Sequence, residues 1–315
     1  MGDTFLPPPQ PDARESLTSR VIPTMKLSSA SNPLTAPLPA VPASLSPSER
    51  ALARFAVTGN AVITGGAGTL ALASARSLLE HGLAGLALLD LTSTLKTSTE
   101  GIGELRRDFP DATILTIPVD VRDEVQVNEA MSCASVGFPG SSIDILCCFA
   151  GVVGCVPSLH ASASEWRRVI EVNQTGSFIC AQAAAKYMIE RGPNTTGSSI
   201  LFISSISGQS VNYPQPQAAY NVSKAGVKHL TRCLAAEWAV HGIRVNCISP
   251  GYMDTVLNAG ESLGPVRDVW ASRCPMGRMG DIEELTGAVV LLCSGRAGRY
   301  ITGADVVVDG GAVCF

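Results

Sequence analysis

Two side chains able to move protons, Tyr220 and Lys224, stand four residues apart in the stretch 219–226. This stretch predicts a helix, in which such a spacing places both side chains on one face, one turn apart. A phenol with its ordinary pKa of about 10 exchanges protons poorly at neutral pH. A neighbouring ammonium favours the phenolate and lowers that pKa. The pair predicts a proton-transfer group, although Tyr-x-x-x-Lys alone also occurs by chance.

Upstream of this pair stand two further polar residues that could take part in the chemistry. Ser205 follows a short apolar run, and its hydroxyl could bond a substrate oxygen and stabilise charge that develops there. Ser207 is a minor candidate for the same role. Asn173 falls inside a long apolar helix, where a buried amide needs partners. It could hold a water that relays protons to Lys224, or it could be purely structural.

The elements that must position these residues are short apolar runs alternating with longer amphipathic stretches. Such runs suit parallel strands covered on both faces. Connections between parallel strands are right-handed, which gives a doubly wound sheet. We therefore predict one α/β domain of Rossmann type, with a single parallel sheet of about seven strands and helices on both faces. The expected strands are 61–64, 86–90, 113–117, 143–149, 199–204, 244–248 and 305–308, and the expected helices are 69–81, 98–109, 123–136, 164–191, 217–241 and 281–292.

The first run leads into the glycine-rich turn 64–71, which opens a helix. Gly65 and Gly68 would let the backbone approach a bound ligand closely, and the N-terminus of the helix would attract a pyrophosphate. About twenty residues on, Asp90 ends the second run. Its carboxylate could bind both hydroxyls of an adenosine ribose and would repel a 2′-phosphate. The sequence therefore favours NAD(H), with NADP(H) possible, and Asp90 as a solvated strand-end carboxylate is the alternative. Asp120 could meet the adenine or cap the next helix.

The bulk composition narrows the classes of protein further. A net charge of −4 and the absence of a long apolar run argue against nucleic-acid or membrane partners. Ten cysteines without Cys-x-x-Cys pairs favour reduced thiols and a cytoplasmic location, with no metal site. Residues 1–52 are rich in Pro, Ser and Ala and predict a disordered arm, or less readily a targeting peptide. Residues 53–315 then form the catalytic domain.

Taken together, these motifs closely resemble the short-chain dehydrogenase/reductase family over residues 60–311. The resemblance implies a catalytic tetrad at Asn173, Ser205, Tyr220 and Lys224, and a nicotinamide-facing loop at 250–255 in which Thr255 meets the carboxamide. The cofactor contacts expected in all are Gly65, Gly68, Thr69, Leu70, Asp90, Asp120, Val121, Ala150, Gly151, Tyr220, Lys224, Pro250, Gly251, Met253 and Thr255. Thr69, Ala71 and Phe149 depart from the family pattern, the first two replacing glycines and the third an asparagine.

The resulting prediction is an NAD(P)-dependent oxidoreductase that interconverts a secondary alcohol and a ketone. The overall pattern is similar to fungal enzymes acting on polyols, ketoses or secondary-metabolite ketones. Segments 153–159, 209–215 and 252–276 are expected to line the substrate pocket, the last as a helical lid. Family resemblance further implies a homo-tetramer or dimer through the helices at 164–191 and 217–241. The competing hypothesis is a non-catalytic dinucleotide-binding scaffold or pathway partner, which the three departures favour.

Overall fold

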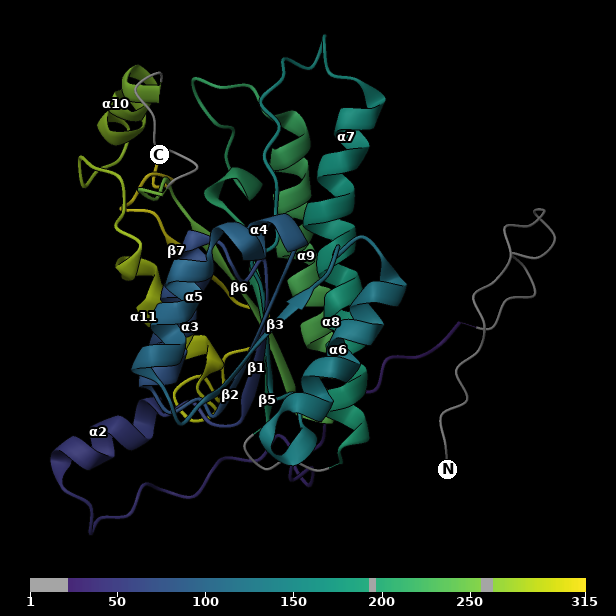
Figure 1. Ribbon diagram of the computed structural model, residues 1–315, viewed down its shortest axis with the longest axis vertical. Coiled ribbons are helices and arrows are strands. Elements are labelled where there is room, and N and C mark those ends of the chain that lie inside the picture. The colour runs from purple at the N-terminus through teal and green to yellow at the C-terminus, as the bar shows by residue number, and fades with distance from the viewer. Residues whose placement is uncertain (1–21, 193–196, 256–262) are drawn as a thin grey trace.

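The computed structural model describes residues 22–192, 197–255 and 263–315. Within them, parallel strands form one sheet in the order β3-β2-β1-β4-β5-β6-β7, which confirms the predicted Rossmann-type sheet (Figure 1). The strands are β1 (Asn60–Thr64), β2 (Gly85–Asp90), β3 (Thr113–Pro118), β4 (Ile145–Cys148), β5 (Ser198–Ile203), β6 (Ile243–Pro250) and β7 (Asp305–Val308). Because β1 and β4 lie at the centre and pair with each other, the chain reverses its direction of winding there.

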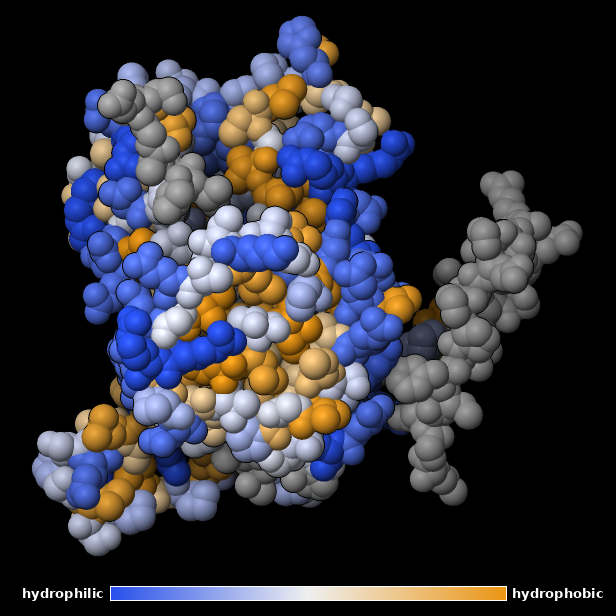
Figure 2. Space-filling view, in the orientation of Figure 1, coloured by the Kyte–Doolittle hydropathy of each residue, from blue (hydrophilic) through white to orange (hydrophobic). Residues whose placement is uncertain are grey.

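Helices cover both faces of the sheet (Figure 1). One apolar core joins the sheet to α3, α5 and α11, and a second joins it to α6, α8 and α9. The helices are α2 (Pro47–Phe55), α3 (Thr69–Glu80), α4 (Thr92–Thr97), α5 (Thr99–Asp108), α6 (Glu124–Gly137), α7 (Ala163–Ile170), α8 (Gly176–Glu190), α9 (Ala218–Trp238), α10 (Gly264–Ser272) and α11 (Glu283–Cys293). Figure 2 shows apolar side chains gathered over the edge strand β3, between α5 and α6.

Three helical elements differ from the sequence prediction, and one of them, α2, begins at Pro47 inside the segment that was predicted to be an arm. The single helix expected over 164–191 is divided, because α7 ends at Ile170 and a π-helical turn, Glu171–Thr175, precedes α8. The apolar period continues through such a turn, so the pattern could not reveal it. Helix α4 was not predicted at all. It buries none of its residues, and a helix without an apolar face leaves no periodic signal.

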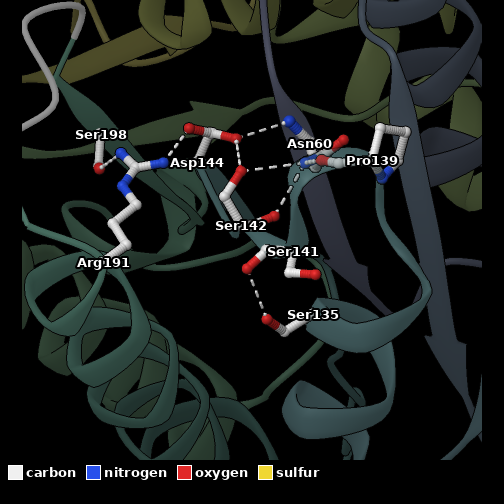
Figure 3. Close-up of polar contacts among 8 residues, drawn as sticks. All are labelled: Asn60, Ser135, Pro139, Ser141, Ser142, Asp144, Arg191 and Ser198. Carbon is white, nitrogen blue, oxygen red and sulfur yellow. Dashed lines mark hydrogen bonds and ion pairs between the residues drawn. The ribbon is translucent and has the colours of Figure 1, made fainter.

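A polar network fastens the amino ends of the central strands (Figure 3). Asp144, just before β4, pairs with Arg191 at the end of α8 and accepts hydrogen bonds from the Asn60 backbone N–H and the Ser142 hydroxyl, both at 2.9 Å. Gly59 has a φ of +87°, and a Cβ there would lie 2.3 Å from the Asp144 carboxylate. This network ties β1, β4 and α8 together at the end of the sheet opposite the predicted site.

The part of the predicted arm that the structure describes crosses the same end of the sheet (Figure 1). Residues 22–46 contain no helix or strand, and α2 follows them. Arg299 donates hydrogen bonds to the carbonyls of Leu34 and Ala36, at 3.0 and 2.8 Å, and Arg296 donates to that of Pro39 at 2.9 Å. The composition of this segment argued against a packed apolar core. The segment contacts the domain without such a core, because these hydrogen bonds join its backbone carbonyls to arginine side chains.

Candidate active site

The carboxyl ends of the strands bring the predicted site residues to one edge of the sheet. In a doubly wound sheet this edge is where ligands bind, at the point where the winding reverses. The turn 65–68 follows β1, Asp90 ends β2, Ala150 and Gly151 follow β4, Ser205 follows β5, and Pro250 ends β6. Helix α9 carries Tyr220 and Lys224 along the same edge.

The turn after β1 is shaped for close contact with a dinucleotide. Gly65 has a φ of +64°, and a Cβ there would lie 2.5 Å from the backbone nitrogen of Ala150. Helix α3 begins at Thr69 with Gly68 as its N-cap, and no described side chain caps its first turn, so Thr69 and Leu70 offer N–H groups to an anion. Ala71 is 1% exposed within the apolar core. The residues at this turn therefore fit a pyrophosphate. Ala71, which replaces a family glycine, is accommodated because its methyl group packs within the apolar core.

Asp90 and Asp120 stand in different environments at the next two strand ends. The Asp90 carboxylate accepts hydrogen bonds from the N–H groups of Ala67, at 3.1 Å, and Leu91, at 2.8 Å, which fixes its direction beside the glycine turn. Asp120 forms an ion pair with Arg122, and this hydrogen-bonded contact lowers the pKa of the Asp120 carboxyl. The predicted alternative of a helix cap at Asp120 is wrong, because Asp123 caps α6 through the N–H groups of residues 125 and 126.

The π-helical turn between α7 and α8 aims Asn173 at the strand end. Its side chain, 1% exposed, accepts a hydrogen bond from the Val152 N–H at 2.8 Å and donates to the Val152 carbonyl at 2.9 Å. It also donates to the Ser223 hydroxyl on α9 at 3.0 Å. A Cβ on Gly151 would lie 3.4 Å from Asn173 Oδ1 and 3.6 Å from Lys224 Nζ. Asn173 is therefore both a structural bridge and a neighbour of the lysine. Such π turns recur at functional sites.

Tyr220 lies in the first turn of α9, and Ser205 lies just after the end of β5. Their side chains form a hydrogen bond. The Ser205 hydroxyl donates to that of Ser207 at 3.0 Å, so both candidate serines lie in one cluster. Burial raises the pKa of Tyr220 to about 12, and a hydrogen bond with Ser205 partly opposes this shift. The sequence had suggested a lowered pKa for this phenol. Desolvation of the buried phenol outweighs the hydrogen bond with Ser205, so the net shift of the Tyr220 pKa is upward.

Lys224 is buried one turn beyond Tyr220. Its ammonium donates a hydrogen bond to the Ile203 carbonyl at 2.7 Å and lies 5.6 Å from the centre of the Tyr220 ring. Burial lowers the pKa of Lys224 to about 8. The lysine is thus held rigidly beside the phenol, and its proton is more easily released than that of an exposed lysine.

The loop after β6 lies at the same edge of the sheet as the other predicted site residues. A Cβ on Gly251 would lie 2.8 Å from the Cα of Asp309, so the loop passes tightly beside the end of β7. Met253 is buried in the α3/α11 core and pairs as a bridge with Gly280. Thr255 is buried, and residues 256–262 of the predicted lid lie outside the described residues. Helix α10 forms the later part of the segment that was predicted to be a lid.

Sequence reasoning placed the segments 209–215 and 252–276 near the substrate but missed the contact that joins them. Asn212 and Gln215 both donate hydrogen bonds to the Tyr252 hydroxyl, and Trp270 of α10 stacks on the Tyr252 ring with centroids 4.2 Å apart. The only signal in the sequence was a pair of amides within an unusually long loop. Residues forty positions apart gave no pattern that could pair them.

Comparison with known proteins assigns the family. Residues 65–313 match the family model described as enoyl-(acyl carrier protein) reductase. A crystal structure of a short-chain type dehydrogenase/reductase from Mycobacterium marinum superimposes with a TM-score of 0.76 and 35% identity, covering 84% of this chain and 99% of that one. The chain therefore belongs to the short-chain dehydrogenase/reductase family, and it is an NAD(P)-dependent oxidoreductase of alcohols and ketones.

Curated relatives of similar length act on polyols and ketoses. The ribulose-forming D-arabinitol 2-dehydrogenase of Scheffersomyces stipitis is 37% identical, covering 81% of this chain and 94% of its own. The NADP-dependent mannitol dehydrogenase of Hypocrea jecorina is 36% identical, with coverages of 83% and 95%. The NADH-dependent L-xylulose reductase of Ambrosiozyma monospora is 34% identical, with 79% and 93%. Among the described residues of this chain, none of the helices has the length and apolar content for a membrane crossing.

Proposed function

We propose that this protein interconverts a polyol and its ketose with NAD(H), using Ser205, Tyr220, Lys224 and Asn173. The observation that carries the proposal is the meeting of Tyr220, Lys224 and Ser205 beside the glycine turn, at the sheet edge where ligands of this fold bind. The polyol assignment draws on the names of the relatives, which include D-arabinitol and mannitol dehydrogenases.

The chemistry divides simply among these groups. A bound nicotinamide dinucleotide supplies or accepts the hydride. In alcohol oxidation, Tyr220 takes the hydroxyl proton while the carbon gives up its hydride, and in ketone reduction Tyr220 returns that proton to the oxygen. Ser205 holds the reacting oxygen by a hydrogen bond. The Lys224 ammonium stabilises the phenolate form of Tyr220, and Asn173 fixes the strand-end backbone beside the lysine.

The preference for NAD(H) rests on the Asp90 carboxylate. Its direction is fixed by two backbone N–H groups at the end of β2, beside the glycine turn. A 2′-phosphate placed there would meet a like charge at a cost of about 1–4 kcal/mol near a surface. The relatives include both NADP- and NADH-dependent enzymes, so the support for NAD(H) comes from Asp90.

The decisive experiment follows reduced nicotinamide by its near-ultraviolet absorbance, with D-arabinitol, mannitol and the corresponding ketoses as substrates. Tyr220→Phe should lower turnover by about 10²–10⁴-fold, as expected for a proton-transfer group. Tyr300→Phe removes the same hydroxyl from a fully exposed ring and is the matched control. A wild-type protein that binds the dinucleotide but turns over none of these substrates would instead support the scaffold hypothesis.

The assembly is proposed to be a homo-dimer or tetramer through α7, α8 and α9. These helices expose large apolar side chains, including Trp166, Phe178 and Val222, whose relative exposures are 41%, 38% and 48%. A contiguous apolar patch is a common mark of an interface, and we propose that these side chains belong to one. Light scattering on the purified protein tests this, with Phe178→Glu expected to lower the measured mass. A monomeric wild type would contradict it.

A further inference from the structure

The Tyr252 hydroxyl is held by two amides from the loop between β5 and α9. Asn212 Nδ2 donates to it at 2.6 Å, and Gln215 Nε2 donates at 3.1 Å. Gln215 is oriented in turn by Trp270, whose Nε1 donates to Gln215 Oε1 at 3.1 Å. The parallel stack of Tyr252 on Trp270, with an interplanar angle of 6°, holds the ring in place. The phenol therefore has little freedom to turn.

This arrangement fixes the direction of the Tyr252 hydroxyl hydrogen. A phenolic oxygen accepts about two hydrogen bonds and donates one. Because both amides donate to it, its acceptor capacity is used and its own hydrogen is left to donate. Among the described residues, no acceptor is in hydrogen-bond contact with that hydrogen. The hydroxyl hydrogen is thus available to donate to a ligand atom.

The amide oxygen of Asn212 supplies the matching acceptor. Asn212 Oδ1 is buried and has no hydrogen-bond partner among the residues that the structure describes. A buried acceptor left without a partner costs about 1–3 kcal/mol, and such an exception calls for an explanation. Since the Asn212 amide nitrogen already touches the Tyr252 oxygen, a free donor and a free acceptor stand side by side. One alcohol hydroxyl can satisfy both, because it donates one hydrogen bond and accepts another.

The pair lies beside the proton-transfer group. Tyr252 is two residues past the end of β6, at the same sheet edge as Ser205 and Tyr220. The charges of the Tyr252 and Tyr220 phenolates repel each other, which contributes to the raised pKa of Tyr220. Because Tyr252 and Ser205 follow the ends of the neighbouring strands β6 and β5, a substrate oxygen held by Ser205 would have its neighbouring carbons on the side of Tyr252.

We propose that Asn212 and Tyr252 form a hydroxyl-recognition subsite that selects substrates with a further hydroxyl close to the reacting carbon. The proposal rests on the proposed function and deepens it by naming the residues that distinguish a polyol from a simple secondary alcohol. A site built to bond a hydroxyl rejects an analogue without it, because its own polar groups are then left unpaired. Gln215 and Trp270 are positioning residues, since they act through Tyr252.

The test compares D-arabinitol with cyclohexanol, a secondary alcohol that has no second hydroxyl. Tyr252→Phe removes the donor and Asn212→Leu removes the acceptor. Each variant should lower kcat/KM for D-arabinitol by about 10–100-fold, as expected when one partner of a buried hydrogen bond is lost. Each should change kcat/KM for cyclohexanol by less than about 3-fold. Tyr300→Phe, on a fully exposed ring, is the control and should change neither value.

The outcomes separate this proposal from the function on which it rests. Equal losses on both alcohols in the two variants, or unchanged kcat/KM for D-arabinitol, would overturn the subsite. A wild type that prefers cyclohexanol would overturn it too, while leaving the alcohol dehydrogenase function intact. A wild type that oxidises neither alcohol and reduces no ketose overturns both. Circular dichroism of each variant confirms that the fold is kept, and Tyr252→Phe loses only one oxygen atom.

Discussion

The ammonium of Lys224 lies 5.6 Å from the centre of the Tyr220 ring and donates a hydrogen bond to the Ile203 carbonyl at 2.7 Å. Helix α9 supplies both residues, and the end of β5 supplies the carbonyl. One charge is thereby buried beside the phenol at the cleft. Burying a charge is costly, so this arrangement should serve function at the expense of stability.

The first prediction concerns the free-energy cost of burying the Lys224 charge. Burial lowers the pKa of Lys224 to about 8, against about 10.4 for an unfolded lysine. Below pH 8 both states hold the proton, and the folded state bears the full cost of the charge. Between about pH 8 and 10 only the unfolded state still holds it, so stability rises with pH. Lys224→Met should therefore raise the free energy of unfolding at pH 7 by up to about 3 kcal/mol and abolish activity.

Urea unfolding of the dinucleotide-free protein at pH 7 and pH 10 measures this effect. The advantage of Lys224→Met should be largest at pH 7 and should shrink towards pH 10. Lys186→Met, at an exposed position on α8, is the matched control and should show no such pH dependence. A Lys224→Met protein that is less stable than the wild type at pH 7 would refute the assignment of this cost.

The second prediction concerns the choice of dinucleotide. Asp90→Ser removes the carboxylate that faces the glycine turn and keeps a small acceptor for the Ala67 N–H. Removing a like charge worth about 1–4 kcal/mol should raise the ratio of kcat/KM for NADPH to that for NADH at least about 5-fold. Asp111→Ser, at an exposed position before β3, is the control. A wild type that already prefers NADPH would show that Asp90 does not set the choice.

The third prediction concerns the network of Figure 3. Arg191→Met removes the arginine that pairs with the buried Asp144 carboxylate, and breaking a buried ion pair typically costs about 3–5 kcal/mol. Thermal unfolding should show a clearly lower Tm, while Arg107→Met at an exposed position should not. Since the network lies at the amino ends of the strands, kcat measured well below the Tm should stay unchanged. A large fall in kcat there would mean that the two ends of the sheet are coupled.

The fourth prediction concerns the arm. We propose that the bonds from Arg299 to the Leu34 and Ala36 carbonyls hold residues 32–39 against the domain. Arg299→Ala removes these charge-assisted bonds, each worth about 1.5–3 kcal/mol. A broad-specificity protease should then cut within residues 22–46 at least several-fold faster. Arg232→Ala, at an exposed position on α9, is the comparison. Equal cleavage rates in the two variants would show that the arm is not held by Arg299.

The sequence by itself determined the sheet and most of its helices, and it supplied the residues that we propose transfer protons. Strand and helix periods are local patterns, and the rule that ligands bind at carboxyl ends of parallel strands placed Ser205 and Asp90 at one edge. Tyr220 and Lys224 could be paired because a helix fixes the spacing of residues four apart. These inferences needed no knowledge of contacts between distant segments.

Only the tertiary structure decided the features that depend on distant segments meeting. It decided the π turn at Asn173, the ion pair of Asp144 with Arg191, and the donor and acceptor pair of Asn212 and Tyr252. It also decided that burial raises the pKa of Tyr220, since desolvation depends on everything packed around a group. The physical reason is common to all of these. Packing between residues far apart in the chain leaves no periodic trace in the order of the amino acids.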